Sequence, residues 1–159
     1  MSTETIAVPP QLERVDQRVA GVMRKYGNRV LRYALALIFI RFGAVKFGGD
    51  DLSPANDLVE RTIYWLPPAL FMPVLAAWEV LIGICLLFRP LIRAGIFLLF
   101  AQMVGTFLPV VILPDITWQH IPYAPTLEGQ YILKNLVIIG AALVIGGTVR
   151  QRSSEERHL

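Results

Sequence analysis

The chain has 159 residues, of which 55% are hydrophobic and 17% charged, and its mean hydropathy is +0.54. This composition argues against an ordinary water-soluble domain, which carries more charge at this length. The formal net charge is +3. Because the basic residues follow the membrane topology described below, we attribute this charge to contact with anionic lipid head groups and expect no nucleic-acid partner.

The first 28 residues form a predicted cytoplasmic tail with an amphipathic helix. Apolar side chains recur there at helical spacing, opposite a mostly charged face; they are Leu12, Val15, Val19, Val22, Met23 and Tyr26. This pattern is typical of a helix that lies on the inner membrane surface. Residues 1–10 fit a solvated tail equally well. No apolar core of a cleavable signal peptide is present in residues 1–28.

Four apolar segments follow, and each approaches the roughly 20 residues that a helix needs to cross a bilayer. They cover residues 31–47, 67–88, 94–114 and 131–149. A lipid-exposed backbone must satisfy its own hydrogen bonds, so the segments are predicted to be helices. We therefore predict an all-α, integral membrane four-helix bundle over residues 29–149, with a tail at 150–159. A soluble bundle is the competing interpretation, and the complete lack of charge in the third segment disfavours it.

Basic residues fall on one side of this four-span arrangement. They are Arg14, Arg18, Arg24, Lys25, Arg29, Arg32, Arg89, Arg93, Arg150, Arg152 and Arg157. The loops on the other side are mainly acidic, with Arg61 as their basic exception clear of a helix. By the positive-inside rule, both termini are predicted to be cytoplasmic.

Several kinds of membrane redox chemistry do not fit the residues present. The two histidines, His120 and His158, lie outside the predicted spans, which disfavours an intramembrane haem held by two histidines. Cys85 is the single cysteine, so dithiol chemistry cannot occur within one chain. The spans contain one acid, Glu79, and no histidine, so we expect no metal site.

Polar residues at similar depth suggest a buried layer in the bundle. With a rise of about 1.5 Å per residue, Arg41 lies roughly 15 Å into the first span and Glu79 roughly 18 Å into the second. Gln102 reaches a similar level in the third span. Because ionisable groups in a membrane are usually paired or functional, we predict that Arg41 pairs with Glu79 and that Gln102 completes the layer. An ion pair that only fixes helix register is the alternative.

A second polar layer is predicted at the outer surface. Lys46 ends the first span, while Lys134 and Asn135 begin the fourth. The loop between spans three and four adds Trp118 and His120 above them. Two lysines below an aromatic lid could hold an anion or the oxygen atoms of a quinone, together with Glu79. Alternatively, the lysines simply reach for water, and His120 is either a proton carrier or an ordinary surface group.

Four stretches carry a resemblance to a known family. They are "LRYALALIFIRFGAVKF", "WEVLIGICLLFRPLIRAGI", "TFLPVVILPDITW" and "PTLEGQYILKNLVIIGAALVI", which together cover roughly residues 29–149. In these stretches the sequence resembles the DoxX-like family of small four-helix membrane proteins, and within it the YkgB-like branch that includes a reactive-chlorine-resistance membrane protein. The family's loose pattern maps onto Lys46, Glu79, Gly83, Pro109, Gly129 and Lys134. The resemblance implies no catalytic residue.

The resemblance also implies a cellular setting. Proteins similar to this family are associated with thiosulfate:quinone oxidoreductase as membrane subunits and with membrane complexes that defend against oxidative or thiol stress. A bacterial cytoplasmic (inner) membrane location is implied as well. Since the chain lacks a cysteine pair, a subunit that faces quinone or recruits a partner is favoured over an independent redox enzyme.

Three functional hypotheses remain open at the level of sequence. The first is a redox-associated membrane subunit with a quinone or small-molecule site, a redox partner that is soluble or membrane-bound, and no other evident cofactor. The second is a non-catalytic scaffold that recruits a soluble partner through its basic inner surface. The third, a small-solute permease, is disfavoured because the fourth segment lacks a continuous polar face. A homo-oligomer is compatible with each of them.

Overall fold

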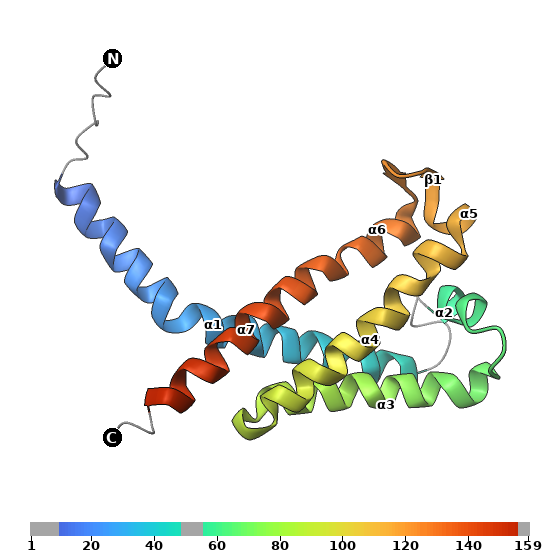
Figure 1. Cartoon of the computed structure of the whole chain (residues 1–159), viewed down its shortest axis with the longest axis horizontal. Coiled ribbons are helices and arrows are strands. Elements are labelled where there is room, and N and C mark those ends of the chain that lie inside the picture. Colours follow the sequence, from blue (N-terminus) through green and yellow to red (C-terminus); the bar gives the residue numbers. More distant parts are fainter. Residues whose placement is uncertain (1–9, 49–55, 156–159) are drawn as a thin grey trace, which may run out of the picture.

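A computed structural model of the chain describes residues 10–48 and 56–155, and these residues are mainly helical. Four long helices dominate them: α1 (Pro10–Phe47), α3 (Pro68–Leu87), α4 (Ile92–Ile112) and α7 (Asn135–Glu155) (Figure 1). The prediction of an all-α protein is therefore confirmed for the main elements. Residues 1–9 and 156–159 of the two predicted tails lie outside the described part.

Short elements join the long helices. They are α2 (Asn56–Thr62), the 3₁₀ turn η2 (Arg89–Leu91), α5 (Pro114–Thr117), β1 (Trp118–His120), β2 (Ala124–Pro125) and α6 (Leu127–Leu133). The segment from α5 to α6 gathers at one end of the molecule (Figure 1), and we call residues 114–133 the cap. We call the opposite end, where α3 ends and α4 begins, the tail end.

The long helices pack in the cyclic order α1, α3, α4, α7, so that each contacts two neighbours. Their apolar side chains meet in one core, because the face of each helix that contacts its two neighbours is shielded from the surroundings. The largest buried side chains in this core are Phe39 of α1, Ile82 and Leu86 of α3, Leu99 of α4 and Ile145 of α7. Large apolar residues on the outer faces remain exposed, as expected for helices that face lipid.

Helices α1 and α3 approach most closely at two glycines. The Cβ position of Gly43 lies 2.5 Å from the carbonyl oxygen of Ala76 in α3. The Cβ position of Gly83 lies 2.5 Å from Ile40 Cγ1 and 2.7 Å from the carbonyl oxygen of Ala36. Small residues of this kind let two backbones approach inside a membrane bundle. The chain thus holds α1 and α3 antiparallel and at short range.

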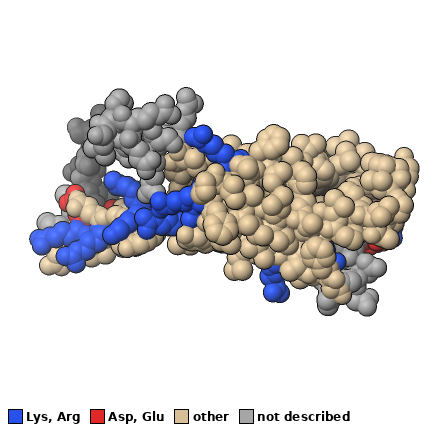
Figure 2. Space-filling model, turned by 90° about the horizontal axis from the view of Figure 1, so that it is seen from below, with Lys and Arg blue, Asp and Glu red and all other residues tan. Residues whose placement is uncertain are grey.

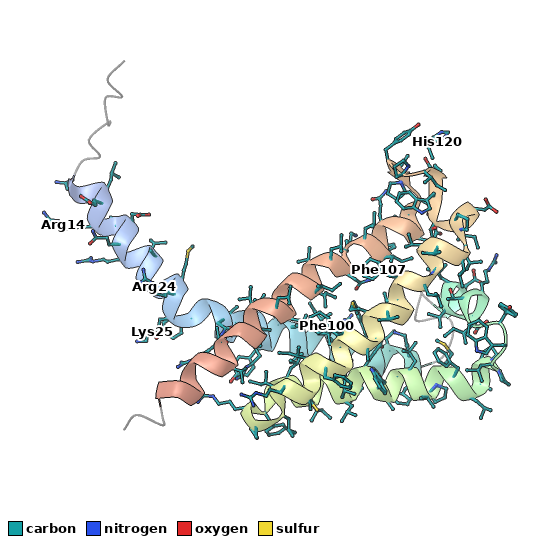
Figure 3. All side chains as sticks on the ribbon, viewed as in Figure 1. Arg14, Arg24, Lys25, Phe100, Phe107 and His120 are labelled. Carbon is teal, nitrogen blue, oxygen red and sulfur yellow. The ribbon has the colours of Figure 1, made fainter. Side chains whose placement is uncertain are left out.

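The N-terminal part of α1 leaves the bundle. Residues 11–19 are all exposed, and Figure 1 shows this part of the helix bending away from the other helices. Arg14, Arg24 and Lys25 lie along it (Figure 3), and Figure 2 shows basic side chains gathered at this end of the molecule. The predicted surface helix and the predicted first span are therefore consecutive parts of one helix. Its attachment to a membrane surface stays a prediction.

Three helical segments are long and apolar enough to cross a membrane by length and composition. They are Pro68–Leu87, Arg89–Ile112 and Leu127–Val149, which correspond to the second, third and fourth predicted spans. The first predicted span, residues 31–47, is not among them, since this half of α1 carries Arg32, Arg41 and Lys46. The structure thus contains three candidate membrane-spanning segments, and the crossing by α1 stays a prediction.

The glycines at the contact of α1 and α3 make a direct test of this packing. We expect Gly83→Ala to lower the free energy of unfolding by about 1–3 kcal/mol, because the added Cβ overlaps α1. Gly140→Ala is the matched control, since nothing lies within 4 Å of its Cβ position. Alanine is the better helix former, so the control should be neutral or slightly stabilised. Thermal unfolding in detergent micelles measures both, and equal stability of the two variants would contradict the close contact.

Candidate functional site

Glu79 of α3 lies at the centre of a buried polar cluster. Its Oε2 atom is 2.7 Å from Lys46 Nζ of α1, and the two side chains are only 6% and 7% exposed. Its Oε1 atom accepts a hydrogen bond of 2.8 Å from Gln102 Nε2 of α4. Three helices therefore meet at one carboxylate. We call Lys46, Glu79 and Gln102 the buried triad.

The buried triad depends on where Lys46 lies on α1. The buried positions of this helix recur every three or four residues, and they are Arg32, Leu35, Ala36, Phe39 and Gly43. Lys46 continues this stripe one turn later, in the last turn of α1. Helical side chains tilt toward the N-terminus of their helix. The long side chain of Lys46 therefore reaches back into the bundle, toward the middle of α3.

The predicted pairing of Arg41 with Glu79 is wrong. Arg41 is exposed, and the cation that contacts Glu79 is Lys46. Five residues separate Arg41 from Lys46, which places the two about 140° apart around the helix axis. The depth of a residue along a helix does not determine which face of the helix it occupies. The other predicted member of this layer, Gln102, does contact Glu79.

The surroundings of the buried triad are aromatic and partly open. Lys46 Nζ lies 5.9 Å from the centre of the Phe42 ring. The side-chain oxygen Oε1 of Gln102 is enclosed and has no hydrogen-bond partner among the described residues. Gln102 as a whole is half-buried, and nothing lies within 4 Å of the Cβ position of Gly105, one turn further along α4. The surface of α4 is thus open at Gly105, one turn from the enclosed Gln102 Oε1 atom.

The cap has more structure than the loop that the sequence predicts. Strands β1 and β2 pair antiparallel, with Trp118 opposite Pro125 and His120 opposite Ala124, and the peptide bond from Ile121 to Pro122 is cis. His120 is exposed, and its ring stacks on that of Tyr123 with centres 5.8 Å apart. Figure 3 places His120 at the tip of the cap, away from the long helices.

Backbone contacts and polar side chains fix the cap to the bundle. Trp118 donates from Nε1 to the carbonyl oxygen of Val110 at 3.3 Å, which ties β1 to the end of α4. Thr126 caps α6, since its hydroxyl accepts a hydrogen bond from the backbone N–H of Gly129. At Gly129 a Cβ would overlap the carbonyl oxygen of Thr117. A glycine is therefore required where α6 passes α5.

Lys134 marks a joint in the fourth predicted span. It lies between α6 and α7, and its ammonium group lies 4.5 Å from the centre of the Tyr131 ring. Lys134 is exposed. The neighbouring Asn135 donates from Nδ2 to the carbonyl oxygen of Tyr131 at 3.4 Å. The side chains of Lys134 and Asn135 thus contact their own helix turn.

Two residues of the predicted outer site, Lys46 and Glu79, contact each other directly. Lys46 and Glu79 form an ion pair, whereas the contacts of Trp118, His120, Lys134 and Asn135 lie within the cap and the adjoining helix ends. The two lysines therefore have different partners. In residues 10–48 and 56–155, no three His, Cys, Asp or Glu side chains lie close enough together to hold a metal ion.

Removing either Lys46 or Glu79 should lower the free energy of unfolding. We expect Glu79→Gln to lower the free energy of unfolding by about 3–5 kcal/mol, because Lys46 is then enclosed without a counter-charge. Lys46→Met should have a similar effect, and the double variant Lys46→Met/Glu79→Met should recover most of the loss. Chemical unfolding in detergent measures these changes.

Arg41→Gln is the matched control, because it removes a cation from the exposed face of the same helix. We expect it to change stability by no more than about 0.5 kcal/mol. The ion pair would be contradicted if Glu79→Gln were as stable as the wild-type protein, or if Arg41→Gln were equally harmful.

Comparison with known proteins places this fold and site in a family. Searches of curated proteins and of solved structures give no significant match. Residues 27–112, more than half of the chain, match the DoxX family. The matched range contains α3, α4 and all three members of the buried triad. The chain therefore belongs to the DoxX family of membrane proteins.

Proposed function

We propose that the protein is a membrane subunit of a redox or oxidative-stress system, and that it binds a quinone or a similar small molecule at the buried triad. The observation that carries this proposal is the enclosed Gln102 Oε1 atom, which has no hydrogen-bond partner in the described chain although Gln102 Nε2 is fixed by Glu79. If the ion pair of Lys46 and Glu79 served only to join helices, the cluster would not need Gln102 Oε1 as a further hydrogen-bond acceptor. Ionisable residues inside a membrane bundle indicate a functional site by default.

The chemistry of the buried triad suits a quinone head group. Lys46 has three N–H donors, one of which bonds Glu79. A remaining donor could bond a quinone carbonyl oxygen, while Gln102 Oε1 could accept a hydrogen bond from the hydroxyl of the reduced form. The ring of Phe42 beside Lys46 adds an apolar surface. These residues would bind and orient the head group.

The electron donor in this proposal belongs to a partner. The chain has one cysteine, Cys85, which is buried, so a thiol pair that exchanges electrons cannot form within it. This supports a subunit rather than an independent enzyme. In this arrangement the ligand contacts would come from Lys46 and Gln102, since the contacts of Trp118, His120, Lys134 and Asn135 lie within the cap and the adjoining helix ends.

The proposal includes a topology. We propose that α1 is a fourth membrane span, that both termini are cytoplasmic, and that the protein resides in a bacterial inner membrane. Support comes from the packing of α1 against both α3 and α7 and from the ion pair that neutralises Lys46. We also propose the YkgB-like branch, on the basis of the "GQYILKNL" stretch at the junction of α6 and α7.

Cysteine labelling tests this topology. In a Cys85→Ala background, we expect a cysteine at Gln17 to be labelled only from the cytoplasm, and a cysteine at Gln119 only from outside. Both side chains are exposed. Three spans separate the two positions if α1 crosses the membrane, whereas two separate them if it does not. Labelling of both cysteines from the same side by a membrane-impermeant maleimide would contradict the fourth span.

Photolabelling tests the ligand. We expect a photoreactive azidoquinone to label the wild-type protein in lipid nanodiscs and excess unmodified quinone to prevent it. Gln102→Leu should weaken the labelling about tenfold, which corresponds to the loss of one hydrogen bond. Gly105→Trp should weaken it by blocking the open side of α4.

Two variants serve as controls for the photolabelling. Arg41→Gln and Gly140→Trp should leave it unchanged, because the first alters the exposed face of α1 and the second lies on α7. The quinone site would be refuted if the wild-type protein showed no labelling that excess unmodified quinone prevents. It would also be refuted if Gln102→Leu and Gly105→Trp were labelled as strongly as the wild-type protein.

A scaffold that recruits a soluble partner is the second candidate function. The observation that favours it is the exposed N-terminal part of α1, whose basic side chains gather at one end of the molecule (Figure 2). Such a helix presents both charge and an apolar stripe to a partner. A soluble protein that copurifies in mild detergent, together with a negative result in the quinone experiment, would favour this function.

A further inference from the structure

A second buried polar cluster lies at the tail end, on the same stripe of α1 as Lys46. Arg32 is only 6% exposed, and its Nε atom is enclosed without a hydrogen-bond partner among the described residues. Its guanidinium lies 4.6 Å from the centre of the Tyr33 ring. In the described part of the chain, no carboxylate forms an ion pair with Arg32. A buried cation of this kind requires an anion from elsewhere.

Asn28 lies one turn before Arg32 and joins α1 to α7. Its Nδ2 atom donates a hydrogen bond of 2.5 Å to Thr148 Oγ1, and Thr148 in turn donates to the carbonyl oxygen of Ile145. The other amide atom, Asn28 Oδ1, is enclosed and accepts no hydrogen bond from the described residues. The cluster thus offers one donor and one acceptor that the described chain does not satisfy.

The contacts of α1 with α3 define the depth of this cluster. Gly83 of α3 packs against Ala36 of α1, and the two helices run antiparallel. Arg32 lies four residues before Ala36, so it is level with the residue four positions after Gly83. That residue is Leu87, where α3 ends. Arg32 and Asn28 therefore lie at the level where the spanning helices end, which is the level of lipid head groups.

We propose that Arg32 and Asn28 bind a phosphate-bearing head group at the tail end of the bundle. The guanidinium of Arg32 would donate charge-assisted hydrogen bonds to the phosphate oxygens. Asn28 Oδ1 would accept a hydrogen bond from a hydroxyl or ammonium group on the same head group. A phospholipid such as phosphatidylglycerol or phosphatidylethanolamine supplies both groups, whereas phosphatidylcholine lacks the donor.

This site is separate from the buried triad. Arg32 precedes Lys46 by fourteen positions on α1, a rise of roughly 21 Å along the helix. Exposed basic residues at the same end, Arg29, Arg89 and Arg93, would attract an anionic head group without enclosing it. The two sites can therefore be tested independently.

Native mass spectrometry of the full-length protein tests the proposal. After removal of bound lipid in detergent, the wild-type protein should retain phosphatidylglycerol about tenfold more tightly than diacylglycerol, which lacks the phosphate. Arg32→Gln should lose about tenfold in affinity for phosphatidylglycerol. Asn28→Leu should lose the preference for phosphatidylglycerol and phosphatidylethanolamine over phosphatidylcholine.

Arg29→Gln is the matched control, because it removes an exposed cation from the same part of α1 and should change the affinity by less than about twofold. Equal losses in Arg32→Gln and Arg29→Gln would overturn the proposal in favour of a diffuse basic surface. Equal retention of phosphatidylglycerol and diacylglycerol by the wild-type protein would overturn it too, even if Arg32→Gln failed to fold. If the protein bound inorganic phosphate but did not retain phosphatidylglycerol, the site would bind a soluble phosphate anion, and the proposal of a lipid ligand would be rejected.

Discussion

A carboxylate inside an apolar helix bundle must be neutralised, and the structure depends on how this is done for Glu79. Lys46 supplies the opposite charge and Gln102 supplies a hydrogen bond, so one side chain of α3 connects α1 to α4. This connection requires α1 to lie very close to α3. The backbone approach at Gly43 and Gly83 provides that proximity, because any larger side chain would separate the helices.

The same constraint explains how α1 carries several charges beside three apolar helices. Lys46 is paired near the cap end, Arg32 is level with the last residue of α3, and Arg41 is exposed on the opposite face. Each charge thus has a partner or a position near a helix end, or it can extend along the outer surface toward water. A helix of this composition is less apolar than its neighbours, yet it packs against two of them.

The sequence predicted α3 and α4 closely, because runs of apolar residues near the length of a membrane span have few alternative structures. It predicted that Gln102 shares a buried layer with Glu79, but it paired Glu79 with Arg41, because the depth of a residue along a helix does not indicate which face of the helix it occupies. The small residues Ala36 and Gly43 mark the face of α1 that meets α3, and Lys46 continues that face. The hairpin of the cap was not predicted, since strands of three and two residues leave little periodic signal.

The central claim is that Lys46, rather than Arg41, contacts Glu79 within the bundle. Solid-state NMR on the protein in lipid can measure the dipolar coupling between the side-chain nitrogen of Lys46 and the carboxyl carbon of Glu79. The structure, with Lys46 Nζ 2.7 Å from Glu79 Oε2, predicts a strong coupling for this pair and none between Glu79 and the guanidinium nitrogens of Arg41. A coupling to Arg41 with none to Lys46 would contradict the account.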